Sequence, residues 1–83
     1  MPEHTYRLDV LALLAVHGVF PRRHTRPELV RAFVRDLYKY ELRRLRDRYV
    51  AGAFPKREYW GLVDQLRRKY PVLALRAHEW VEP

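Results

Sequence analysis

Apolar residues at helical spacing divide this chain into three predicted helices, at about residues 6–17, 26–51 and 56–70. In the first, nearly every position of the run LDVLALLAV is apolar. In the second and third, apolar residues recur every three or four positions along one side, which is typical of an amphipathic helix. A buried β-strand is the rival interpretation of the first segment, but leucine and alanine outnumber β-branched residues there and favour a helix. The pattern therefore predicts an all-α fold.

Residues that commonly begin or end helices support these boundaries. Thr5 is a candidate N-cap for the first helix, and Gly18 is placed to adopt the left-handed conformation that often ends a helix. The stretch from Thr25 to Glu28 matches a capping box, in which the threonine oxygen accepts from the glutamate amide and the glutamate side chain reaches back. Pro27 suits the first turn, because its missing N–H would have no partner there. No further helix breaker occurs before Gly52.

The short link between the second and third helices predicts a hairpin. Only a few residues lie between the second helix and Pro55, and a link this short makes two helices run antiparallel, side by side. Pro71 ends the third helix, and we expect the tail, residues 71–83, to form a strap with one helical turn that Trp80 anchors. The prediction is one domain over residues 1–83: a small helical bundle with a long central helix, an antiparallel hairpin and a C-terminal strap.

The first predicted helix raises a packing problem. A helix that is apolar all round is buried on most sides, so we expect its side chains to be covered. The first and third helices together nearly match the second in length, and each is expected to lie along one half of it. That arrangement leaves the outer face of the first helix exposed to solvent unless the strap or a second copy of the chain covers it. An isologous dimer is the commonest solution.

Composition places the chain among folded proteins. Its 83 residues are 48% hydrophobic and 33% charged, and it has no cysteine, so disulfides and thiolate chemistry are excluded. The longest apolar run, residues 8–16, contains Asp9 and is too short to cross a bilayer, and no secretory leader is recognisable. We therefore expect a cytoplasmic protein without a membrane partner. Many arginines, no serine and no asparagine give a thermophile-like composition.

Positive charge is concentrated in the middle of the chain. The net charge is +7, and residues 22–51 contain ten of the 17 lysines and arginines against four carboxylates. Such a balance permits nucleic acid or an acidic protein as a partner. It does not require one, because arginines that serve thermostability resemble a binding patch.

Two sets of cations are candidate contacts for phosphate groups. The first precedes the second helix, whose N-terminus attracts anions, although Glu28 already supplies a negative charge there. The second set lies within a band of about 80° opposite the apolar stripe and could follow a nucleic-acid backbone. Against this, Asp36 and Asp47 are placed to pair with Lys39 and Arg43 on the same helix. The candidates are Arg22, Arg23 and Arg26 in the first set, and Arg35, Lys39, Arg43 and Arg46 in the second.

Base-specific reading is not predicted. The connection from residue 18 to residue 25 is longer than the three- or four-residue turn of a helix–turn–helix motif. A nucleic-acid partner would therefore be held through its backbone.

Aromatic residues beside the apolar stripes indicate a candidate interface. Tyr40 and Trp60 flank the stripes, a position where interfaces favour amphipathic rings. Gly61 lies inside the third helix at a cost of about 1 kcal/mol relative to alanine, so we expect another helix to approach closely there. With the first helix included, the candidate interface residues are Leu11, Leu14, Tyr40, Trp60 and Gly61.

Two carboxylates have predicted partners. Glu41 projects within the apolar stripe, and Arg44 and Arg48 flank the same side, so we expect a partly buried ion pair that fixes helix register. Asp64 lies one turn before the two arginines near the end of the third helix, where surface pairs are expected.

The reactive side chains present argue against an enzyme. Thr5 and Thr25 are the only aliphatic hydroxyls, and both are expected to cap helices. The four histidines lack the spacing of a zinc site, and three isolated glycines form no phosphate-binding loop. We predict no catalytic residue, no cofactor and no metal. The leading hypothesis is a non-catalytic interaction module that forms a dimer and docks an acidic partner; the alternative is a nucleic-acid-binding protein.

Overall fold

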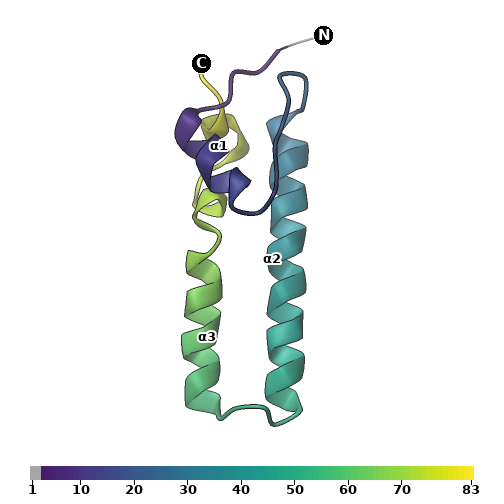
Figure 1. Ribbon diagram of the computed structural model, residues 1–83, viewed down its shortest axis with the longest axis vertical. Helices are drawn as coiled ribbons and strands as arrows, with labels where there is room; N and C mark the ends of the chain where they lie inside the picture. The colour runs from purple at the N-terminus through teal and green to yellow at the C-terminus, as the bar shows by residue number, and fades with distance from the viewer. Residues whose placement is uncertain (1–2) are drawn as a thin grey trace.

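The computed structural model describes residues 3–83 as a rod with extents of 50 × 18 × 18 Å. The two longest helices run antiparallel, and the remaining elements gather at the end where the longer one begins (Figure 1). The all-α fold, the hairpin and the C-terminal strap are confirmed. The elements are α1 (Leu8–Ala15), α2 (Pro27–Val50), α3 (Lys56–Arg68) and two 3₁₀ helices, η1 (Pro71–Ala74) and η2 (Ala77–Trp80).

The helix α2 is continuous, as its unbroken apolar spacing predicts. It begins with Pro27 in the first turn, and Gly52, with φ of 84°, turns the chain directly after it toward α3. The predicted capping box is wrong. Arg26 occupies the N-cap position without a side-chain cap, and the Thr25 hydroxyl oxygen instead accepts from the Arg22 amide at 3.0 Å. Because the helix starts at residue 27, Thr25 is one position too early and closes the preceding turn.

The helix α1 is shorter than the predicted span of residues 6–17, because its flanks have other partners. Tyr6 forms an antiparallel bridge with Val81, and the Glu82 amide donates to the Thr5 carbonyl at 2.8 Å. Thr5 is therefore extended and does not cap the helix; Arg7 stands at the N-cap. At the other end, Gly18 adopts the left-handed conformation predicted for it, with φ of 72°.

Apart from Leu45 farther along α2, the buried core residues gather at the end of the rod formed by α1, η1, η2 and the first turns of α2, which we call the head. Trp80 is completely buried there, and its indole N–H donates to the Val72 carbonyl at 3.2 Å. It anchors the strap as predicted. The buried core cluster consists of Tyr6, Val10, Leu14, Val30, Val34, Tyr70, Val72 and Trp80.

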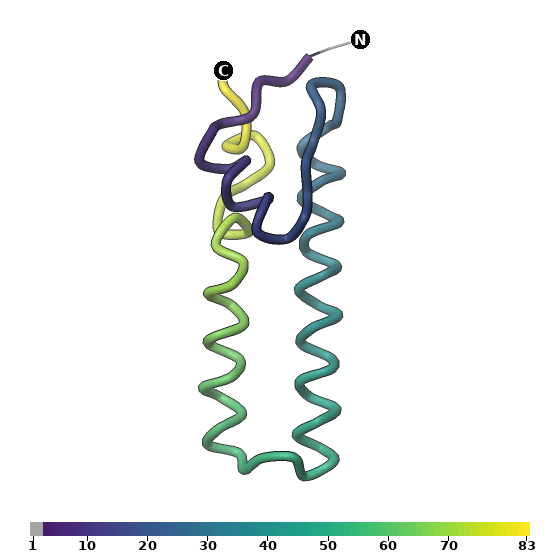
Figure 2. Tube along the Cα trace, viewed as in Figure 1, coloured from purple at the N-terminus to yellow at the C-terminus, as the bar shows by residue number. Residues whose placement is uncertain are grey.

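The strap continues beyond α3 toward the head, and α1 lies against it (Figure 2). It contacts both α1 and α2, and the Arg31 guanidinium on α2 donates to the carbonyls of Leu73 and Leu75 at 2.9 and 2.8 Å. Because η1 and η2 occupy the upper part of α2, α1 packs on the strap and not along half of α2. The expectation of a first helix buried on most sides is wrong, since Leu8 is 83% exposed.

Candidate functional site

The helix α2 offers two solvent-facing flanks of different chemistry. Its inner face is fixed by Val30, Val34 and Leu45, which are buried. At 100° per residue, the exposed positions fall on both sides of that face. The basic flank consists of Arg35, Lys39, Arg43 and Arg46, and the apolar flank consists of Leu29, Phe33 and Tyr40.

The cations of the basic flank face solvent and lack carboxylate partners. All four are exposed, and within residues 3–83 none has a carboxylate oxygen within 4.0 Å. The predicted pairs of Asp36 with Lys39 and of Asp47 with Arg43 are not formed. An exposed pair of this kind is worth only about 0.2–1 kcal/mol, so the helix does not depend on it. The flank is an open row of positive charge that advances about 6 Å with each four-residue step.

The loop arginines do not join the basic flank in one pocket. Arg22, Arg23 and Arg26 are exposed, and the loop that carries them is tied to the head, where the Tyr6 hydroxyl donates to the Thr25 carbonyl at 2.6 Å. Burial, together with the Glu28 carboxylate, raises the pKa of Tyr6 to about 12.

A cation from the strap joins the basic flank instead. Arg35 lines a hollow of about 220 Å³ together with Arg31, Arg76 and Glu28. Sequence reasoning missed Arg76, because no local spacing relates the strap to α2. Only the packing of η2 on α2 brings them together.

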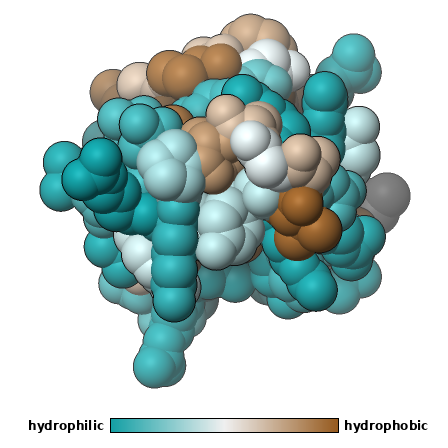
Figure 3. Space-filling view, turned by 90° about the horizontal axis from the view of Figure 1, so that it is seen from below, coloured by the Kyte–Doolittle hydropathy of each residue, from teal (hydrophilic) through white to brown (hydrophobic). Residues whose placement is uncertain are grey.

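The apolar flank continues into a groove between α2 and the preceding loop. Phe20, Leu29 and Phe33 line this groove, which has a volume of about 360 Å³, and they are 74%, 61% and 55% exposed. Figure 3, seen from the hairpin end, shows hydrophilic residues over most of that face, with hydrophobic residues along one edge and in a separate cluster toward the right. Sequence reasoning missed this groove, although Leu29 and Phe33 lie off the apolar stripe of α2 and could have drawn attention to it.

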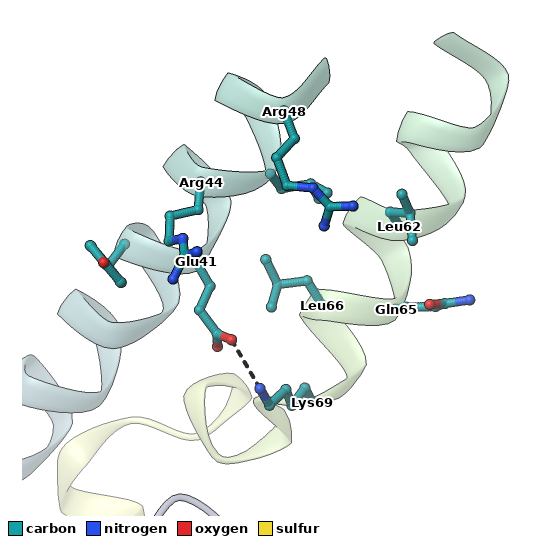
Figure 4. Close-up of a pocket in the computed structure, with 9 residues that line it drawn as sticks. Glu41, Arg44, Arg48, Leu62, Gln65, Leu66 and Lys69 are labelled. Atoms are coloured by element: carbon teal, nitrogen blue, oxygen red, sulfur yellow. Dashed lines mark hydrogen bonds and ion pairs between the residues drawn. The ribbon is translucent and has the colours of Figure 1, made fainter. Parts of the chain in front are cut away.

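A larger groove of about 540 Å³ lies between α2 and α3 (Figure 4). Leu45, Leu62 and Leu66 supply its apolar surface, and Arg44 and Arg48 extend over it from α2. The helix α3 beside it has no buried residue along its thirteen positions. We call it the hairpin groove. The complete lining is Tyr40, Glu41, Arg44, Leu45, Arg48, Leu62, Gln65, Leu66 and Lys69.

Glu41 joins the two helices at the upper end of the hairpin groove. It accepts a hydrogen bond from the Tyr70 hydroxyl and forms an ion pair with Lys69 at 2.9 Å. The His17 ring stacks on the Tyr70 ring. The predicted pairs with Arg44 and Arg48 are wrong, because the end of α3 brings closer donors. Burial alone would raise the pKa of Glu41, but the hydrogen bonds from Tyr70 and Lys69 outweigh it and hold that pKa below its usual range.

The predicted interface residues do not form one surface. Leu14 is completely buried in the core, so it is unavailable to a partner, and Leu11 packs against the same cluster. Gly61 has no atom within 4 Å of where a Cβ would stand, so the predicted close helix approach is wrong. Tyr40 and Trp60 are 58% and 60% exposed. They lie at different levels, since Trp60 neighbours Tyr59, which stacks on Tyr49 near the hairpin turn.

The predicted pairs at the end of α3 do form. Asp64 accepts from Arg67 at 2.8 Å and from Arg68 at 2.9 Å. These arginines are therefore paired within the helix.

The described residues contain no cluster of three or more histidine, aspartate or glutamate side chains that could hold a metal ion. None of the helices in residues 3–83 has the length and apolar character needed to span a membrane. Comparison with protein-family models, curated proteins and solved structures finds no match to this chain.

Proposed function

We propose that this chain is a non-catalytic helical interaction module that pairs with a second copy of itself. The observation that carries the proposal is the exposure of large apolar side chains along the apolar flank and the adjoining loop. Contiguous exposed apolar surface, rimmed by polar residues, is typical of protein interaction sites. The core of the head is complete without these side chains, so folding of a single chain does not explain them.

The packing of the hairpin supports the same proposal. Within residues 3–83, Leu45 is the only core side chain that is buried below the head, and α3 contributes none. The hairpin groove therefore keeps apolar surface that a second molecule would cover. Burial of apolar surface is the main favourable contribution to most protein–protein associations.

The test is the molar mass in solution, measured by light scattering over about a hundredfold range of concentration. We expect the unmodified chain to form dimers, and the double variant Leu29→Gln, Phe33→Gln to dissociate at concentrations where the unmodified chain does not. Val50→Gln is the matched control, because Val50 is 74% exposed but lies outside the apolar flank. A chain that stays monomeric throughout the range would contradict the proposal.

Nucleic-acid binding is a second candidate, favoured by the open row of cations on the basic flank. A partner held there would contact phosphates, and its affinity would fall linearly on a double logarithmic plot against salt. We expect Arg43→Gln to weaken binding to mixed-sequence DNA and to reduce the salt slope by about one. Arg67→Gln is the control, because Arg67 is paired with Asp64. Equal effects of the two variants, or no salt dependence, would exclude the basic flank as the site.

A further inference from the structure

One row of side chains on α2 has a charge order suited to pairing with its own copy. Asp36, Tyr40, Arg44 and Arg48 follow each other at four-residue steps, and all four are exposed. Rows of this spacing form the ridges by which helices pack. The ridge starts on the solvent side beside the apolar flank and crosses into the hairpin groove, where Figure 4 shows Arg44 and Arg48. Its order is acid, aromatic, cation, cation.

We infer that two copies of this chain pair through this ridge, with their α2 helices antiparallel about a two-fold axis level with residue 42. The inference rests on the proposed self-association and names its surface and register. In an isologous pair every contact occurs twice. Asp36 then lies opposite the partner's Arg48, and Tyr40 opposite the partner's Arg44.

The chemistry of both contacts is favourable. A guanidinium donates in a fork to a carboxylate, and it also packs on the face of an aromatic ring. Within one chain, Arg44 already lies 5.9 Å from the centroid of the Tyr40 ring, so a second guanidinium would use the other face of that ring. Asp36 has no cation within 4.0 Å in residues 3–83, so pairing would supply one. A partner helix over the groove also covers Leu62 and Leu66.

Other registers are less complementary. A parallel arrangement would place each residue of the ridge opposite its own copy, so that like charges meet at Asp36, Arg44 and Arg48. Like charges at an interface oppose association. An antiparallel arrangement centred on residue 44 would also place Arg44 against its copy. An arrangement centred on residue 40 pairs Asp36 with the partner's Arg44 but leaves Arg48 without an acid.

The test is a charge exchange, with the dimer dissociation constant measured by analytical ultracentrifugation at about 0.15 M salt. We expect Asp36→Arg and Arg48→Asp each to raise that constant about tenfold, since each puts like charges together at two places. The combination of both changes restores an attractive pair and should return the constant close to its original value. Arg46→Asp is the matched control, because it makes the same charge change on the basic flank.

The sign of the Arg48→Asp effect is informative. The unmodified chain has a net charge of +7, so removing positive charge reduces the repulsion between two copies. By net charge alone, Arg48→Asp and Arg46→Asp would tighten the dimer equally. Weakening by Arg48→Asp alone would support the ridge.

Each other outcome overturns the inference in a distinguishable way. If the charge exchange leaves the dimer dissociation constant unchanged, the proposed self-association stands but this ridge is excluded as the interface. If Asp36→Arg combined with Arg44→Asp restores the dissociation constant, and its combination with Arg48→Asp does not, the two-fold axis lies at residue 40. If the chain is monomeric at every concentration and binds poly-glutamate, its partner is an acidic molecule and not a second copy. That result would contradict both proposals. Circular dichroism and thermal unfolding identify any variant that has lost its fold.

Discussion

Replacing Trp80 by alanine tests whether the head carries the stability of the molecule. The Trp80 side chain is completely buried, and its N–H donates to the Val72 carbonyl. A buried tryptophan removes about 150–250 Å² from water, which at about 25 cal/mol per Å² corresponds to roughly 4–6 kcal/mol. Alanine retains little of that area and leaves a cavity, and measured tryptophan-to-alanine changes in cores cost about 3–5 kcal/mol. We therefore expect the free energy of unfolding to fall by about 4 kcal/mol.

That loss is large for a chain of this size. At about 0.05–0.15 kcal/mol per residue, the total free energy of unfolding is expected to be roughly 4–12 kcal/mol. The assay is urea denaturation followed by far-ultraviolet circular dichroism, at one protein concentration so that dimerisation does not differ between samples. Trp80→Phe should lose less, about 1–2 kcal/mol, because it keeps most of the volume and loses the hydrogen bond.

Trp60 provides the matched control for this experiment. It is 60% exposed on α3, so Trp60→Ala makes the same chemical change outside the core. We expect a loss below about 1 kcal/mol, mainly from its edge-on contact with Tyr59. Equal losses at the two tryptophans would refute the conclusion that the buried core is concentrated in the head.

Three further predictions concern substitutions at single positions. Arg31→Met removes the donors to two carbonyls of the strap and should lower the free energy of unfolding by about 1–3 kcal/mol in urea denaturation. Glu41 has a lowered pKa, so its contribution to stability is present above the ordinary value of 4.5 and is lost as pH falls below it; Glu41→Gln should flatten the dependence of melting temperature on pH there. Gly61→Ala should raise the melting temperature, because the helical site is open, whereas Gly52→Ala should lower it, because φ of 84° strains alanine.

The parts of the fold that depend on local periodicity could be predicted from the sequence. The helix α2 has apolar residues at regular spacing between a proline and a glycine, and the short link to Pro55 leaves little choice but a hairpin. Trp80 can be predicted as the anchor of the strap because it is the one large aromatic residue in that segment. These features follow from neighbours along the chain.

The sequence predictions are wrong where contacts between distant segments determine the partner of a side chain or a backbone group. Helical spacing predicts that Glu41 pairs with arginines on its own helix, but Lys69 and Tyr70, which follow α3, hold it. The sequence predicts Thr5 as a helix cap, but its carbonyl accepts from the Glu82 amide near the other end of the chain. Helical spacing contains no information on such contacts. The same limit explains why the predicted interface combined the buried Leu14 with exposed residues of another element.

The uneven packing of the rod leads to one further conclusion about its stability along the hairpin. In the head, α2 is held by η1, η2 and the core, whereas toward the turn it is held against α3 chiefly by half-buried side chains and by the stack of Tyr49 on Tyr59, 4.6 Å between centroids. Segments with few buried apolar contacts open locally at lower free energy than the core. Amide exchange should therefore be slowest around Val34 and faster toward Val50. Because a second copy across the hairpin groove would add contacts in the weaker half, dimerisation should slow exchange there more than in the head.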